Sequence, residues 1–330
     1  MSKSQKVILI SLLLLPILCL NLYAEEKIRT IEEMANALVE GFVSNLSESP
    51  LNVKIGKLTL KNTNFSSEFA DMFLRQVEWE LKRHKTNFKK ISRVKISTRD
   101  LGLDRIQPGT NIKIKEVTLE GSYWESKGLV IISANLIDEN GSIVSASEIK
   151  IKKSALNWDL APQNLAKIQE IEKEIGHLPS KGDFKIDLWI DKGNGGIYRS
   201  GEDISVMVRA EIDCYLKVLY IDATGNRILM FPTENDSTNR IRKGVLYALD
   251  KENKYTVVPP FGSEVIMAFA STVPFSDAGE INVGGGFRGF SSNKKTSEIV
   301  KSLRGIYTAG EQIDIKRAES RAYLTTVRKR

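Results

Sequence analysis

The sequence predicts an α+β N-terminal part, with helices on a mostly antiparallel sheet, joined by a helix to an all-β, sandwich-like C-terminal part. Two patterns predict this division. Before residue 85, two segments repeat apolar residues every three or four positions, as amphipathic helices do. After residue 184, apolar and polar residues mostly alternate, as in strands buried on one face. A length of 330 residues and a hydrophobic content of 42% suit two folded units, expected at 25–155 and 181–330 with the connecting helix at 156–180.

Residues 1–24 are expected to form a signal peptide. Lys3 and Lys6 precede an apolar run from residue 7 to about residue 20, which is short for a membrane span and is interrupted by Pro16. Ala24 then precedes two acidic residues. We therefore expect cleavage after Ala24 and export of the remaining chain.

Two alternatives for the leader stay open. Cys19 stands where a lipoprotein signal places its acylated cysteine, although Leu18 before it departs from that signal. The position three residues before the expected cut is Leu22, which is not a small residue. Lipidation of Cys19 or an uncleaved leader would attach the protein to a membrane.

The charge balance argues against nucleic-acid binding. The net charge of +7 includes Lys3 and Lys6 of the leader, so the remainder carries +5, spread through mixed stretches. Nucleic-acid binding needs basic residues gathered on one face, which these mixed stretches do not suggest.

Cysteine and histidine are too sparse to predict a catalytic or metal site. Without the leader only Cys214 remains, in the strand-like "AEIDCYLKVLYID", where a small packing group is expected. His84 and His177 lie at helix ends without a neighbouring Asp or Cys pattern. The stretch "DKGNGG" from Asp191 resembles a calcium loop superficially, but its third position is Gly193 and no closing acid follows. No catalytic residue, metal ligand or cofactor is predicted.

The N-terminal elements follow from their periods. The segment 29–46 opens with Thr30 and Glu33 in capping-box register and predicts a helix. A strand is expected at 51–63, and a second helix at 66–84 carries apolar residues at every fourth position. Further strands are expected at 92–98, 115–125, 128–138 and 142–153, the last two joined by a tight turn at Asn140-Gly141.

These segments, "ANALVEGFVSNL", "VKIGKLTLKNTNFSSEFADMFLRQVEWELKRH" and "GSYWESKGLVIISANLIDENGSIVSASEIKI", resemble the exported assembly-factor superfamily of FlgO-like flagellar lipoproteins and CsgG-like curli-secretion proteins. The resemblance covers residues 28 to 153 and implies a bacterial envelope protein in the periplasm or on the periplasmic face of the outer membrane. The sequence lacks the long amphipathic segments of a curli-type pore, so channel activity is not implied.

Pro162 and an apolar stripe at Leu165, Ile168, Ile171 and Ile175 predict the connecting helix, which Gly176 ends. Strands are then expected at 184–191, 204–212, 215–231 with a turn, 254–260, 263–271 and in the tail from Arg321. Several short strands separated by Gly, Asn and Asp turns favour a β-sandwich.

The stretch "IDLWID…IYRSGEDISVMVRAEIDCYLKVLYIDATGNRILMFPTEN…VVPPFGSEVIMAFAST" resembles the bacterial domain-of-unknown-function family 4384 over residues 184 to about 275. The matching positions include Trp189, Tyr198, Tyr215 and Phe261. No catalytic residue is assigned to that family, and its recurrence as an appended module implies recognition or scaffolding.

"INVGGGFRGFSSNKK" contains a GxGxxG at Gly284, Gly286 and Gly289. A phosphate-binding fingerprint needs these glycines between a strand and the first turn of a helix, but the next helix is expected only at Thr296. We therefore expect a flexible glycine loop with Phe287 and Phe290 packed against the sandwich.

The first functional hypothesis is a non-enzymatic envelope protein that acts as an assembly, scaffold or recognition module for an envelope protein or polymer. The alternative is a periplasmic glycan- or small-molecule-binding protein that uses aromatic residues of the sandwich. A hydrolase would require acids that the sequence does not show as a set. The candidate recognition surface consists of Trp189, Tyr198, Tyr215, Phe261, Phe287 and Arg288.

Overall fold

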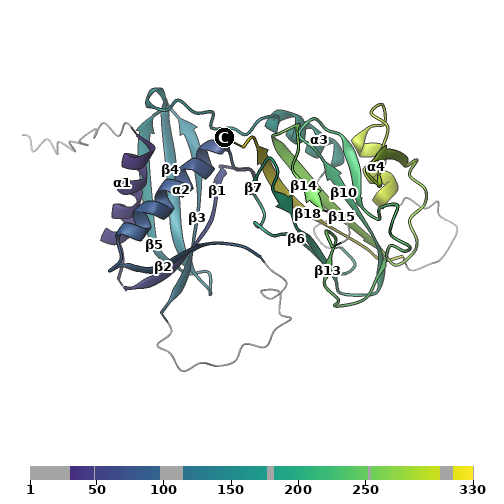
Figure 1. Ribbon diagram of the computed structural model, residues 1–330, viewed down its shortest axis with the longest axis horizontal. Helices are drawn as coiled ribbons and strands as arrows, with labels where there is room; N and C mark the ends of the chain where they lie inside the picture. Colours follow the sequence, from purple (N-terminus) through teal and green to yellow (C-terminus); the bar gives the residue numbers. More distant parts are fainter. Residues whose placement is uncertain are drawn as a thin grey trace, which may run out of the picture.

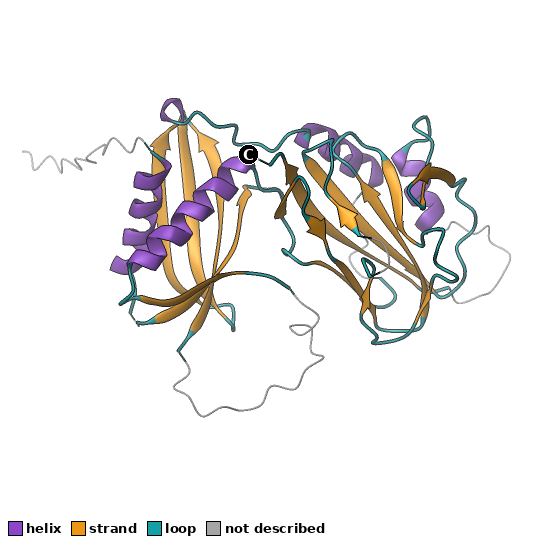
Figure 2. Cartoon of the chain, viewed as in Figure 1, coloured by secondary structure: helices purple, strands orange, loops and turns teal. Residues whose placement is uncertain are grey.

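The computed structural model describes residues 30–47, 49–96, 114–176, 182–251, 254–304 and 315–329. The expected signal peptide with Cys19, and also His177, lie outside these described residues. The chain mixes helices with several sheets and is mostly strand in its C-terminal part, as predicted (Figure 2). None of the described helices is both long and apolar enough to cross a membrane.

Two capped helices open the described chain. Helix α1 (Ile31–Ser44) begins with the predicted capping box, in which the Thr30 hydroxyl accepts from the Glu33 backbone N–H and the Glu33 carboxylate accepts from that of Thr30. Helix α2 (Glu68–Arg83) begins after Ser67, whose hydroxyl accepts from the Ala70 backbone N–H. The capping side chains thus fix where both helices start.

The N-terminal sheet has the strand order β2-β1-β3-β4-β5. Its strands are β1 (Leu51–Leu60), β2 (Phe88–Arg93), β3 (Glu116–Ser126), β4 (Leu129–Asp138) and β5 (Ile143–Lys152). Strand β1 is parallel to both β2 and β3, whereas β3-β4 and β4-β5 are antiparallel. The expectation of a mostly antiparallel sheet was therefore wrong, because the chain returns through α2 and lays β2 beside β1 in the same direction.

The second strand begins at Phe88 and ends at Arg93, earlier than the expected 92–98, and residues 94–96 are not strand.

Helices α1 and α2 lie side by side on one face of this sheet (Figure 1). They bury a core that includes Phe42, Phe69 and Phe73 against sheet residues such as Leu119 and Ile132. The predicted amphipathic stripes are the faces that pack against the sheet.

After a short 3-10 turn η2 (Lys153–Ala155), the chain crosses to the C-terminal part and forms helix α3 (Leu165–Ile175). Ile168, Ile171 and Ile175 of α3 are buried in a cluster with residues of the C-terminal sheet and of helix α4 (Thr296–Arg304). The connecting helix is thus packed on the C-terminal strands along its apolar stripe.

The C-terminal strands form an eight-stranded sheet with the order β16-β17-β11-β10-β15-β18-β7, in which β12 also pairs with β10, a three-stranded sheet β13-β9-β6, and the pair β14-β8. Their bounds are β6 (Ile186–Ile190), β7 (Gly196–Arg199), β8 (Asp203–Ile204), β9 (Val206–Ala210), β10 (Cys214–Ile221), β11 (Arg227–Phe231), β12 (Arg240–Ile241), β13 (Tyr247–Ala248), β14 (Tyr255–Thr256), β15 (Ser263–Ser271), β16 (Ile281–Gly284), β17 (Phe287–Gly289) and β18 (Arg317–Val327).

Strand β15 separates two cores, and all nine of its residues are buried. Ile266 and Ala268 face the core shared with the three-stranded sheet, while Met267 and Phe269 face α3 and α4. Helices at these two positions were expected, but the expectation of an all-β unit did not include their packing as a layer on this sheet. A central strand that is apolar on both faces must be covered on both, and the helices cover the second face.

Candidate functional site

The six residues expected to form a recognition surface do not meet in one place. Trp189 lies on β6 under the Arg209 guanidinium, 5.1 Å from its ring centroid. Tyr215 on β10 pairs with Arg240 and Ser271. Phe261 lies far from it along the sheet and lines a cavity with Trp158 and Thr326. No described pocket brings more than one of the six together.

Tyr198 is fully buried and serves the fold rather than a surface. Its hydroxyl donates to Asp191 Oδ1 at 2.7 Å and accepts from the Lys192 backbone N–H at 3.2 Å. Burial, followed by the charge of Asp191, raises the pKa of Tyr198 well above its ordinary value. Tyr198 therefore holds the turn after β6 in place.

The glycine-rich stretch is a β-hairpin, not the expected flexible loop. Strands β16 and β17 pair antiparallel, and Gly284, Gly285 and Gly286 turn between them with positive φ. Phe290 is buried beside α4, and Phe287 is half-buried with its ring 6.1 Å from that of Tyr255. The packing of both rings was predicted. A hairpin offers no helix start, where a phosphate would meet free backbone N–H groups.

Direct contacts join the N-terminal and C-terminal parts. The Thr325 hydroxyl donates to the Ser66 carbonyl at 2.8 Å, and the Ile96 backbone N–H donates to the Asp191 carbonyl at 2.6 Å. The ring of Phe65 packs edge-on against Tyr323, with centroids 5.3 Å apart. Polar and apolar contacts therefore hold β18 and the turn after β6 against the loop between β1 and α2 and the segment after β2.

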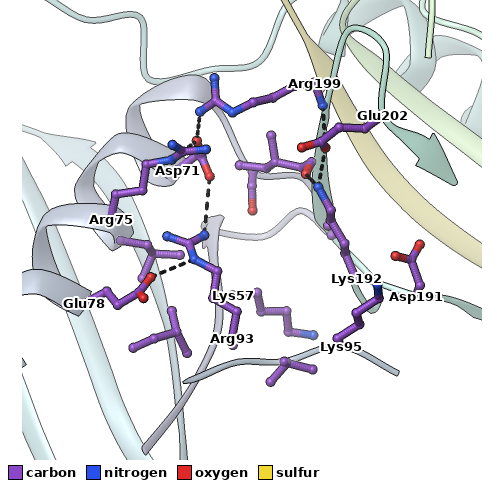
Figure 3. Close-up of a pocket in the computed structure, with 18 residues that line it drawn as sticks. Lys57, Asp71, Arg75, Glu78, Arg93, Lys95, Asp191, Lys192, Arg199 and Glu202 are labelled. Carbon is purple, nitrogen blue, oxygen red and sulfur yellow. Dashed lines mark hydrogen bonds and ion pairs between the residues drawn. The ribbon is translucent and has the colours of Figure 1, made fainter. Parts of the chain in front are cut away.

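A cavity of about 440 Å³ opens at this junction and is called here the junction pocket. Six basic and four acidic side chains line it, and they come from β1, α2, β2 and the segment that follows it, the turn after β6, and β7 with the turn that follows it (Figure 3). The charged lining residues are Lys57, Asp71, Arg75, Glu78, Arg93, Lys95, Asp191, Lys192, Arg199 and Glu202.

Asp71 is the centre of the first group of charges. Its carboxylate is 3.1 Å from Arg75 Nε and 3.6 Å from Arg93 Nη1, and it also pairs with the Arg199 guanidinium from the C-terminal part. The Asp71 side chain is only 9% exposed, so it is shielded from solvent by the arginines around it. One carboxylate thus binds three guanidinium groups, and positive charge remains in excess.

Glu78 lies beside this group and neutralises part of it. It accepts from Lys82 at 2.7 Å and from Arg93 Nε at 2.8 Å. Burial acts to raise the pKa of Glu78, but these two cations outweigh burial and hold that pKa below its ordinary value. Glu78 is therefore ionised at neutral pH and committed to its partners.

Lys192 and Glu202 form the second group, on the opposite wall. The Lys192 ammonium pairs with Glu202 and donates to the Ile197 carbonyl at 2.9 Å. Burial acts to raise the pKa of Glu202, but the Lys192 ammonium and the Arg199 backbone N–H outweigh it and lower that pKa. Asp191 accepts from Tyr198 and from the Ser205 backbone N–H. Every acid of the pocket thus has a donor.

Lys57 and Lys95 differ from the other lining cations. In the described part of the chain neither forms an ion pair, and no interaction is drawn to either in Figure 3. Lys57 is half-buried and Lys95 is exposed. Two unpaired ammonium groups beside partly used guanidinium groups can bind an anion.

The turn after β6 shapes the pocket through glycine. Gly195 has φ +86, and a Cβ at this position would lie 2.9 Å from the Asn64 carbonyl of the N-terminal part. Only a residue without a side chain lets the two backbones approach so closely. The "DKGNGG" stretch, which does not predict a calcium loop, is this turn.

Sequence reasoning missed the junction pocket because its residues come from segments more than 100 positions apart, such as Lys57 and Arg199. Each lysine or arginine looks like an ordinary surface residue within its own element. The glycine-rich turn after Asp191 was the one local signal of a close backbone approach.

The described Cys, His, Asp and Glu residues contain no group of three that could hold a metal ion. Cys214 is buried in the core shared by the eight-stranded and three-stranded sheets, and burial raises the pKa of its thiol to about 11. His84 follows α2, with Nε2 3.6 Å from Glu40 Oε1. Cys214 therefore packs in a core, and His84 lies at a helix end beside an acidic residue.

Comparison with protein families gives one result for the C-terminal part. Residues 197–274 match the family described as Domain of unknown function (DUF4384). The match confirms the resemblance predicted for this part of the chain, and it includes Tyr198, Arg199 and Glu202 at the junction. No curated protein matches the chain.

Proposed function

We propose that this protein is an exported, non-enzymatic recognition module of the bacterial cell envelope, which binds an acidic group of an envelope protein or polymer in the junction pocket. In this proposal residues 25–155 form an assembly-factor-like unit, and residues 181–330 form a sandwich-like unit. The pocket is composite, because residues of both units line it.

The observation that carries the proposal is the pair of unpaired lysines, Lys57 and Lys95, in a pocket whose acids already have donors. Charge far from its counterions draws an oppositely charged partner and raises the rate of encounter. The pocket volume of about 440 Å³ lies within the usual range of about 300–1,000 Å³ for ligand sites.

Export through residues 1–24 would bring the module into the periplasm or to the periplasmic face of the outer membrane. Lipidation of Cys19, or an uncleaved leader, would keep it at a membrane surface. The FlgO-like and CsgG-like resemblance of residues 28 to 153 supports an assembly or scaffold role.

The second candidate is a glycan- or small-molecule-binding protein. A cavity of about 480 Å³ favours it, since Arg288 lines this cavity together with Phe275 and Lys217. The Lys217 ammonium lies 5.5 Å from the Phe275 ring centroid, which gives the cavity both an aromatic and a charged wall.

Photo-crosslinking in the native host tests the first proposal. A photoreactive amino acid in place of Val94, which lines the junction pocket, should give a defined adduct with an envelope component. The same residue in place of Trp79, whose side chain is exposed outside the pocket, is the matched control. The adduct should disappear in a Lys57→Gln/Lys95→Gln background. An adduct that persists there, or that forms equally from position 79, contradicts the proposal.

A further inference from the structure

We infer that the junction pocket binds a phosphate group, a doubly charged oxyanion, in preference to a single carboxylate. This inference rests on the proposed function of the same pocket and names the chemistry of its ligand.

The charge of the lining favours a dianion. Six basic side chains face four acidic ones, and the acids are held by arginine, lysine, tyrosine or backbone donors. Two positive charges therefore remain, and they correspond to the unpaired Lys57 and Lys95. A carboxylate would neutralise one of them, whereas a phosphate at neutral pH neutralises both or nearly both.

The donors around this charge also suit phosphate. Arg75 uses only Nε on Asp71, and Arg93 uses Nε and Nη1, so within the described contacts the remaining guanidinium nitrogens have N–H groups to donate. Each free ammonium adds three N–H donors. These groups come from α2, β1, β2 and the residues after β2, which surround one space (Figure 3). Phosphate offers three terminal oxygens to such converging donors, and carboxylate offers two.

The pocket is larger than an inorganic ion needs. Its volume of about 440 Å³ lies within the range of about 300–1,000 Å³ that is usual for sites of organic ligands. Leu74, Ile55 and Ile197 contribute apolar surface to the same lining. The space beyond the cations therefore suits the organic part of a phosphate monoester.

Calorimetric titration of the purified full-length exported chain tests the inference. Inorganic phosphate, glycerol phosphate and acetate are titrated at one ionic strength, because exposed charges are screened by salt. Both phosphates should bind saturably and at least tenfold more tightly than acetate. Tighter binding of glycerol phosphate than of inorganic phosphate would assign the remaining volume to the organic part of an ester.

Variants show where the anion binds. Lys57→Gln/Lys95→Gln should weaken phosphate binding at least tenfold, and Lys57→Arg should retain it because the charge is kept. The matched control is Lys89→Gln/Lys90→Gln, which removes two exposed lysines of β2 outside the pocket and should leave binding unchanged. Equal thermal unfolding of all variants would show that the folds are intact.

Three results would overturn the inference. Acetate binding as tight as phosphate binding, lost in Lys57→Gln/Lys95→Gln, would refute the phosphate preference but leave acidic recognition by the pocket standing. A phosphate affinity unchanged in that variant would place the anion elsewhere. Crosslinking from position 94 without any phosphate binding would retain the proposed function and reject phosphate as its ligand.

Discussion

Glu264 is a buried acid without a basic partner among the described residues. It has no exposed surface, and its carboxylate accepts from the Tyr220 hydroxyl at 2.6 Å and from the Thr326 hydroxyl at 2.7 Å. Burial raises its pKa from 4.5 to about 7, although both hydrogen bonds act against that rise. The structure therefore holds this proton more tightly than the unfolded chain does.

The sign of the resulting pH dependence follows from linkage. Below pH 4.5 the carboxyl is protonated in both states, so it contributes no difference in stability. Between pH 4.5 and about 7 the unfolded chain releases the proton first, so the free energy of unfolding falls as pH rises. The full loss, reached above pH 7, is about 3 kcal/mol at most.

Glu264→Gln should remove this dependence, because the amide stays neutral and keeps one acceptor for the two hydroxyls. Urea unfolding between pH 5 and pH 8.5 should give a flatter profile for the variant than for the wild-type protein. Glu148→Gln, which changes an exposed acid of β5, should keep the wild-type slope. Parallel profiles for Glu264→Gln and wild type would contradict the assignment.

At the scale of elements, local patterns predicted the helices and most strands, but not how they pair. The capping box at Thr30 and the alternation in β6 depend on neighbours in sequence, so the sequence alone predicts them. The parallel pairing of β1 with β2 depends on the path of the chain through α2, and alternation is the same in parallel and antiparallel strands.

The turn after β6 is an element whose role depends on one glycine. Gly195→Ala should lower the stability by about 2 kcal/mol, because alanine disfavours positive φ and its Cβ would meet the Asn64 carbonyl. Gly201→Ala is the matched control, since Gly201 has φ +82 but no atom within 4 Å of the position that a Cβ would occupy. Thermal unfolding of both variants measures the difference, which should be about 1 kcal/mol in favour of the control. Equal losses would mean that the junction tolerates a side chain here.

At the scale of the whole molecule, the Asp71–Arg199 ion pair links the two parts of the chain. Asp71→Asn leaves Arg75, Arg93 and Arg199 without their shared carboxylate, and Arg199→Gln removes the partner from β7. Each substitution should destabilise the protein. In a double-mutant cycle their coupling should be about 1 kcal/mol, a value reduced because the arginines are partly exposed.

Chemical unfolding of the four members of this cycle gives the coupling energy, and small-angle scattering reports whether the two parts separate. The variants should show a larger radius of gyration if the ion pair holds the junction closed. Additive losses with an unchanged radius would show that the other contacts, such as Phe65 with Tyr323, hold the junction without it.

The sequence by itself determined the local elements and the β-rich character of the C-terminal part, and the match at residues 197–274 agrees with the resemblance read from its motifs. The period of apolar residues records which face of an element is buried, and capping and turn residues record where it ends. Only the tertiary structure decided the mixed strand pairing, the helical cover over β15 and the junction pocket. Lys57, Asp71 and Arg199 become one site through chain folding, and periodicity contains no information about which distant face will cover a buried one.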